Sequence, residues 1–254
     1  KKLNFKIDEY KVTVNGAQLF KEYKTRLYDG NESTRKDYDS IIGLEFKEFY
    51  DGDNLIAWLW YGLCRFEKAI PKNLNPMYGF RIRQGNIQIG DNTVVANLFK
   101  EDRGNSYFIG EIFVVDKNLI PNSQRDYFNE TPARIELEDQ LRRFFYDNLH
   151  NLYYSANKTK NQYKRIKEYN EVSSKLIEKR EKGFVDDKEQ VRMENQVEEA
   201  RKKKDQAKKE LEKMEDGFST GVPLTPKQRV QMAIKKKYDQ QNVLAETENI
   251  EKKE

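Results

Sequence analysis

The sequence predicts an α+β protein, with a mixed-sheet head that has crossover helices, followed by an antiparallel α-helical coiled-coil hairpin. Residues 1–154 hold 26 of the 31 Phe, Tyr and Trp residues, so only this part can bury a large core. After Ala133 the period of the apolar positions changes from two to about three and a half. We therefore expect a head over 1–132, a helical hairpin over 133–217, and a basic helix with a flexible tail over 218–254.

Alternating apolar residues and turn residues place the strands of the head. Apolar and polar residues alternate over 12–16 and lead into a turn. Residues 44–63 predict two strands joined by an Asp-Gly-Asp-Asn turn. The second of these strands is apolar on both faces, which is typical of a central strand. Residues 79–91 predict a strand, a bend at Gly85 and another strand, and an apolar strand over 112–115 ends at Asp116.

Two runs with heptad spacing predict the helical hairpin. The first extends from Phe145 to Ile177 and the second from Met193 to Met214, and Gly183 lies between them as a helix C-cap. Several core positions are polar, so the hairpin needs support from the head or from a partner along its length; these positions are Thr159, Asn170, Ser173 and Lys204. Beyond it, Thr225-Pro226 opens a basic helix, and we expect the last ten residues to be frayed.

Composition excludes several classes of function. Charged residues make up 35% of the chain, but the net charge is only +4, which is not the strongly basic balance of a dedicated nucleic-acid binder. With Cys64 and His150 as its single Cys and His, the chain can assemble neither a Cys/His metal cluster nor a catalytic triad that needs His. No apolar run approaches the length of a membrane span, and we expect a cytoplasmic protein without a membrane partner. Because the chain begins without Met, we expect it to be a piece of a longer protein.

The most informative segment is the polar loop that follows the strand ending at Asp116. It contains Pro121, Asn122 and Arg125, with Asn129 four residues after the arginine, and a long amphipathic helix begins after Pro132. One interpretation of Arg125 is an ordinary surface arginine paired with Asp116 or Asp126. The alternative follows from the order of the motif: strand, Pro-Asn loop, arginine, amide, helix.

This order resembles the middle segment of the ninety-kilodalton heat-shock chaperones. The stretch GFRIRQGNIQIGD at 79–91 is also similar to bacterial ATP-binding proteins related to them, so the resemblance covers about residues 44–154. It implies that Arg125 contacts the γ-phosphate of ATP held by an upstream domain, and that Asn129, where the chaperones carry Gln, orders water or holds the arginine. It also implies ATP and magnesium in that upstream domain, no cofactor in this chain, and a homodimer that closes on ATP.

Other residues are candidates with alternatives left open. Glu111, Asp116 and Asn122 are candidates to contact Arg125 and hold it in place, without touching the phosphate themselves. Arg81 and Arg83 are either the solvated face of an edge strand or a basic face toward nucleotide or client, and Trp58 and Trp60 are either core residues or a client surface. The basic runs at 201–204 and 235–237 have no aromatic residues between the basic ones. This pattern favours solvated helix faces over a nucleic-acid-binding surface.

The nucleotide pocket itself is absent from the sequence. The gyrase, heat-shock chaperone, histidine kinase and MutL superfamily needs an Asn-bearing helix, an Asp-x-Gly-x-Gly turn and a Gly-rich lid, and this chain has none of them. We therefore expect a transducer segment that couples ATP use upstream to a client that the sequence does not identify, protein or nucleic acid. The alternative is a non-enzymatic coiled-coil scaffold or nucleic-acid-interaction protein with a small globular head.

Overall fold

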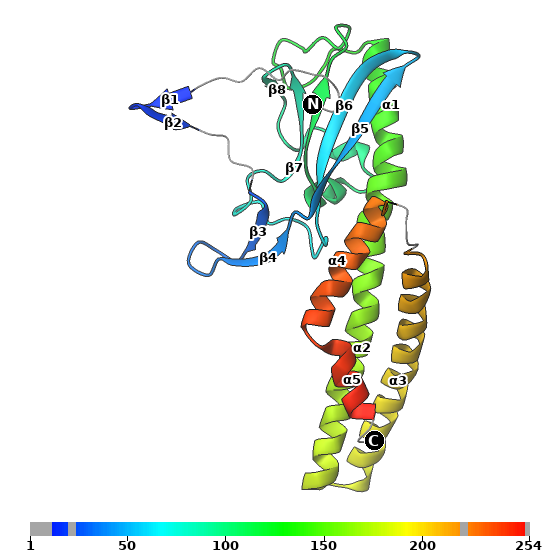
Figure 1. The fold of residues 1–254 in the computed structure, drawn as a ribbon. Coiled ribbons are helices and arrows are strands. Elements are labelled where there is room, and N and C mark those ends of the chain that lie inside the picture. Colours follow the sequence, from blue (N-terminus) through cyan, green and yellow to red (C-terminus); the bar gives the residue numbers. More distant parts are fainter. Residues whose placement is uncertain (1–11, 20–23, 219–222, 252–254) are drawn as a thin grey trace. The chain divides into compact units, whose positions relative to one another are not determined.

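The computed structural model describes residues 12–19, 24–218 and 223–251, and the chain divides into two compact units, residues 1–153 and residues 154–254 (Figure 1). The first unit carries the strands and the second is helical. Two hairpins precede the main sheet, β1 (Val12–Val14) with β2 (Ala17–Leu19) and β3 (Arg26–Asp29) with β4 (Lys36–Ser40). The expected strand and turn at 12–16 are confirmed.

A five-stranded mixed sheet forms the centre of the first unit, in the order β5-β6-β9-β7-β8. Only β7 and β9 run parallel, and the other neighbours are antiparallel. The α+β class and the strands expected over 44–63 and 79–91 are confirmed, and the expected strand at 112–115 belongs to β9. The strands are β5 (Gly43–Asp51), β6 (Asn54–Leu63), β7 (Gly79–Gln84), β8 (Ile87–Ile89) and β9 (Ile109–Val114).

Short 3₁₀ helices make the crossover from β8 to β9, where the sequence predicts crossover helices. They are η1 (Ala96–Leu98) and η2 (Asp102–Tyr107). Gly104 lies inside η2, and its ideal Cβ position is 2.8 Å from the Phe99 ring, so the chain here is too tightly packed for a bulkier residue. Gly and Asn in this segment also disfavour a regular α-helix.

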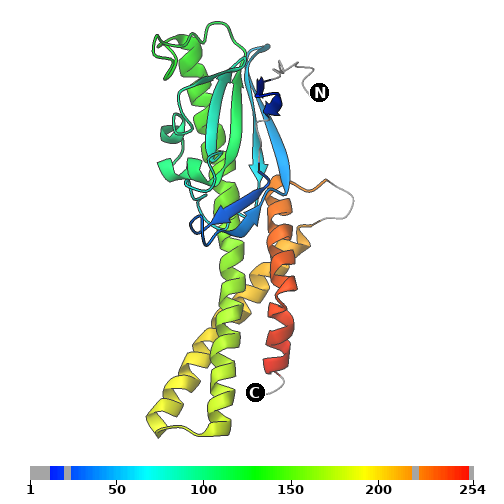
Figure 2. The same cartoon turned by 90° about the vertical axis from the view of Figure 1, so that its left-hand side faces the viewer.

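Helix α1 (Pro132–Phe144) packs on one face of the sheet (Figure 2). Thr131 caps it by accepting a hydrogen bond from the Arg134 backbone N–H, and Pro132 occupies the first turn. At its other end Phe144 meets Phe49 edge-on, with ring centroids 5.9 Å apart. A π-helical segment, η3 (Phe145–His150), follows directly.

The second unit contains two long helices that run antiparallel. Helix α2 (Asn151–Lys182) ends before Gly183, whose φ of +94° is suited to glycine, and α3 (Asp187–Asp216) is capped by Asp186. Ion pairs from Lys179 to Glu189 and from Lys158 to Glu210 link opposite ends of the two helices. The predicted reversal near Gly183 is therefore confirmed.

A third layer of helices covers the seam between α2 and α3. The expectation that the last ten residues are frayed was wrong for residues 245–251, which are helical. Helix α4 (Pro226–Gln240) begins with a Thr225 capping box, and α5 (Val243–Glu251) follows it back along the pair (Figure 2). Ile250 joins a buried apolar cluster with Tyr169 of α2 and Val197 of α3. The C-terminal helices thus supply the partner that the polar seam requires.

Two of the four polar seam residues, Asn170 and Lys204, are bonded to this third layer. Asn170 is 1% exposed and donates a hydrogen bond of 3.0 Å to the Val243 carbonyl. Lys204 is 2% exposed, forms ion pairs with Glu251 and Asp205, and lies over the Tyr169 ring. The expectation that the whole run 201–204 is a solvated face is therefore wrong for Lys204.

Candidate functional site

The loop after β9 folds back on itself as a compact hairpin. Pro121 and Phe128 form an antiparallel bridge, the Asn122 N–H donates to the Tyr127 carbonyl at 2.9 Å, and the Asn129 N–H donates to the Ile120 carbonyl at 2.9 Å. Phe128 is 2% exposed and anchors the base of the loop in the core. The turn at its tip therefore has a fixed position relative to the sheet.

The backbone of Arg125 is held from both sides. Its N–H donates to the Asn122 carbonyl at 3.0 Å, and its carbonyl accepts from the Gly90 N–H at 2.8 Å. Arg125 has a φ of +55°, a left-handed conformation that is uncommon outside glycine and often marks a functional position. Asn122, expected behind Arg125, thus supports it through its backbone, and its side chain donates to Asp126 at 2.5 Å.

The guanidinium of Arg125 is exposed and makes no hydrogen bond or ion pair with any residue that the structure describes. The interpretation of a surface arginine paired with Asp116 or Asp126 is therefore wrong. Asp116 accepts from the Asn118 N–H at 2.8 Å, and Asp126 is bonded to Asn122. The five donors of the guanidinium remain available to an external acceptor.

Asn129 is exposed near the loop base, and in the described part of the chain its side chain forms no bond to Arg125. Its backbone N–H closes the loop instead. The structure therefore does not bring the two expected site residues into contact. The shorter side chain of asparagine, compared with glutamine, is consistent with this result.

Glu111 pairs with Arg83, not with Arg125. Arg83 Nε lies 2.5 Å from Glu111 Oε1, and Trp60 Nε1 donates to Glu111 Oε2 at 3.3 Å. Glu111 is 6% exposed, so this is a nearly buried pair whose disruption would leave a charge without its counterion. The expectation that Glu111 is a partner of Arg125 was wrong, because the neighbouring strand supplies a nearer cation.

Arg81 is also structural. It is 6% exposed and donates to the carbonyls of Met77 and Pro76 at 2.9 and 2.5 Å. With Arg83 paired to Glu111, the expected solvated or basic face formed by these arginines does not exist. Trp58 is likewise a core residue, stacked on Phe113 with centroids 4.2 Å apart.

Two residues that sequence reasoning missed build the loop. Gly90 has a φ of +64°, and a Cβ there would lie 2.5 Å from the Asp126 carbonyl oxygen, so only glycine lets the loop approach. Arg134 donates to the Phe128 carbonyl at 2.9 Å and to Glu138 at 2.8 Å. A cation in the first turn of a helix opposes the helix dipole, and that signal could have identified Arg134 as specifically bonded.

The base of the loop is electrostatically shielded. The Arg134 guanidinium lies over the Tyr127 ring, 4.7 Å from its centroid. Burial, together with the nearby Glu138 carboxylate, raises the pKa of the Tyr127 hydroxyl, so this group stays neutral in the working range of pH. Arg125 is the exposed cation at the tip of the loop, next to the exposed carboxylate of Asp126.

Within residues 12–19, 24–218 and 223–251, no group of three or more His, Cys, Asp or Glu side chains is placed to hold a metal ion. Over the same ranges, no helix is both long and apolar enough to cross a membrane. No protein-family model, curated protein or solved structure matches the chain.

Proposed function

We propose that this chain is the transducer and coiled-coil segment of a chaperone-like ATPase, in which Arg125 contacts the γ-phosphate of ATP bound by an upstream domain. The observation that carries the proposal is the free guanidinium of Arg125 on a loop whose backbone is fixed by hydrogen bonds. The fixed backbone positions the base of the side chain, and a phosphate contact needs a positioned group.

The chemistry of the guanidinium fits this role. Its planar fork grips two phosphate oxygens at once and keeps its charge at all accessible pH values. As charge develops on the transferring phosphoryl group, a positioned arginine stabilises the transition state, as arginine fingers do. ATP and Mg²⁺ would be held upstream, and Asn129 would contact the attacking water from its exposed position beside the loop.

The loop is bonded directly to helix α1. Arg134 of α1 holds the Phe128 carbonyl, so a phosphate that pulls on Arg125 also acts on the first turn of α1. We propose that this coupling moves α2 and α3, acting as an antiparallel coiled-coil arm, and that the longer protein is a cytoplasmic homodimer that closes on ATP around a protein or nucleic-acid client.

A second candidate is a non-enzymatic scaffold, and one observation favours it. Val185, in the turn between α2 and α3, is 84% exposed, which suits a small apolar contact to a partner at the end of the arm. In this case the chain would work without nucleotide.

ATP turnover by the longer protein distinguishes the two candidates. The transducer proposal expects turnover by the protein that contains the upstream domain, and ATP affinity no better than millimolar for residues 1–254 alone by calorimetry, because one finger cannot offset the entropy of binding. A micromolar dissociation constant for residues 1–254, or no turnover by the longer protein, would contradict the transducer proposal.

A further inference from the structure

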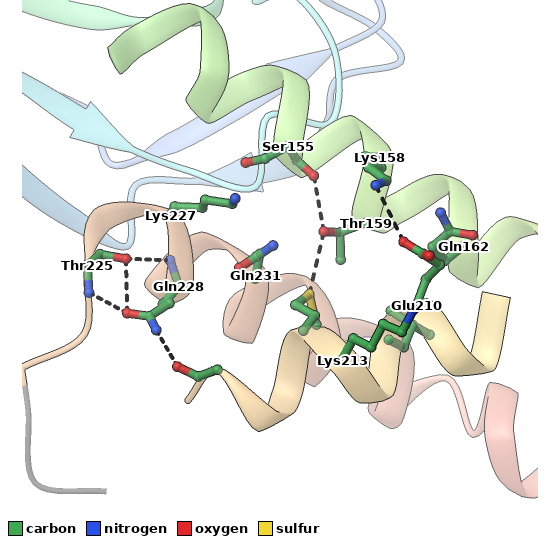
Figure 3. Close-up of a pocket in the computed structure, with 13 residues that line it drawn as sticks. Ser155, Lys158, Thr159, Gln162, Glu210, Lys213, Thr225, Lys227, Gln228 and Gln231 are labelled. Atoms are coloured by element: carbon green, nitrogen blue, oxygen red, sulfur yellow. Dashed lines mark hydrogen bonds and ion pairs between the residues drawn. The ribbon is translucent and has the colours of Figure 1, made fainter. Parts of the chain in front are cut away.

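A cavity of about 430 Å³, lined by both polar and apolar side chains, lies within the helical unit, between α2, α3 and α4 (Figure 3). This volume falls within the usual range of small-molecule sites. Its wall includes Thr159 of α2, Met214 of α3 and Gln231 of α4. The loop of Arg125 contributes none of the described lining residues, so this site is distinct from the proposed ATP contact.

The floor of this cavity is built from buried polar side chains. Thr159, Gln162 and Gln231 are 4%, 7% and 8% exposed, respectively. Thr159 donates to the Ser155 carbonyl at 3.0 Å, and the Gln162 carbonyl oxygen accepts from Arg165 at 3.2 Å. The side-chain amide of Gln231 makes no hydrogen bond to any described residue, so its donors and its acceptor are available to a ligand. Figure 3 shows its side chain extending from α4 into the space beside Thr159.

The rim of the cavity is cationic. Lys158, Lys213 and Lys227 line it, and the one carboxylate is Glu210, which pairs with Lys158 at 3.4 Å. Lys213 and Lys227 are exposed and make no ion pair in the described ranges. Two ammonium groups without a described ion-pair partner therefore lie at the rim, above the amide and hydroxyl groups of the floor.

Gln228 organises the remaining wall. It completes the capping box with Thr225 and donates to the Gly217 carbonyl at 2.6 Å, which joins the start of α4 to the end of α3. These bonds are internal, so the N-terminus of α4 is already satisfied. The recognition groups left for a ligand are the ammonium groups of the rim and the amides of the floor.

We propose that this cavity binds a small phosphate monoester with hydroxyl groups, such as a sugar phosphate. The phosphate lies between Lys213 and Lys227, since ammonium groups bind phosphate oxygens as charge-assisted donors. The hydroxyl groups of the ligand bond to Gln231 and Gln162. None of the lining residues is aromatic, so the cavity offers no surface on which a nucleobase could stack.

Calorimetry with residues 1–254 at about 150 mM salt tests whether the cavity binds a sugar phosphate. The probes are glucose 6-phosphate, inorganic phosphate, glucose and AMP. We expect glucose 6-phosphate to bind, inorganic phosphate to bind at least threefold more weakly, and glucose to give no heat. The double variant Lys213→Gln, Lys227→Gln should lower the affinity for glucose 6-phosphate at least tenfold. The single variant Gln231→Met should lower this affinity about threefold or more.

The control is Lys209→Gln, Lys236→Gln, which removes two exposed lysines from the same helices outside the cavity. It should leave affinity within twofold, and circular dichroism should show unchanged folding for both double variants because all four lysines are exposed. Absence of glucose 6-phosphate binding at millimolar concentration, an equal loss in the control, or AMP binding more tightly than glucose 6-phosphate would overturn the proposal.

Discussion

Replacing Asn170 by Ala should loosen the C-terminal helix α5 from the long pair. Asn170 donates to the Val243 carbonyl at 3.0 Å and accepts from the Thr247 hydroxyl at 2.7 Å. Each bond contributes about 1 kcal/mol net, and the small cavity left by the truncation adds about 1 kcal/mol. The better helix propensity of alanine offsets about 0.5 kcal/mol, so the expected loss is about 2–3 kcal/mol.

Hydrogen exchange measures this loss locally, which matters because unfolding of a chain with two units need not be two-state. A loss of about 2 kcal/mol corresponds to roughly 30-fold faster exchange in peptides covering Val243–Glu251. The matched control is Glu171→Ala, an exposed neighbour on α2, which should change exchange less than about twofold. Unchanged protection of α5 in Asn170→Ala would refute the conclusion that this bond network joins α5 to the helical pair.

Two further predictions concern the first unit. Gly90→Ala should destabilise the first unit by about 2 kcal/mol more than Gly85→Ala. Both glycines have a positive φ, but only at Gly90 would a Cβ lie against the Asp126 carbonyl. Equal melting temperatures of the two variants would contradict this prediction. Burial, with the nearby Lys100, lowers the pKa of His150, so the unfolded chain takes up the proton first and stability should fall as pH decreases below about 6.5. Melting curves between pH 7 and pH 5.5 should show this decline in the wild type and a smaller one in His150→Gln, and equal slopes would exclude the effect.

The sequence predicted those elements whose signals are local. The turn around Gly52, the bend at Gly85, the helix start at Thr225-Pro226 and the break at Gly183 all depend on residues next to one another in the chain. The polar heptad positions even predicted that the hairpin needs a partner. They could not identify residues 243–251 as that partner, because the match between Asn170 and α5 is a contact across more than 70 residues.

The site was harder to predict because charge pairing is decided between strands. Alternation places Arg83 on one face of its strand, but the sequence does not show its partner. The parallel register of β7 and β9 sets Arg81 opposite Glu111, and Arg83, two residues further along, pairs with Glu111 diagonally. Arg81 lies on the same face, yet its partners are carbonyls of the preceding loop. What the sequence did isolate was Arg125, and the structure leaves its side chain exposed and its backbone fixed.

The most direct test of the proposed function is the ATP turnover of the longer protein with Arg125→Ala, compared with Gln124→Ala, an exposed neighbour in the same loop. The transducer proposal predicts a kcat at least about tenfold lower for Arg125→Ala, nucleotide affinity within a few-fold, and incomplete rescue by Arg125→Lys, because a single ammonium lacks the bidentate fork. Gln124→Ala should remain close to the wild type. Wild-type kcat in Arg125→Ala, at saturating ATP and at concentrations where the protein dimerises, would contradict the proposal.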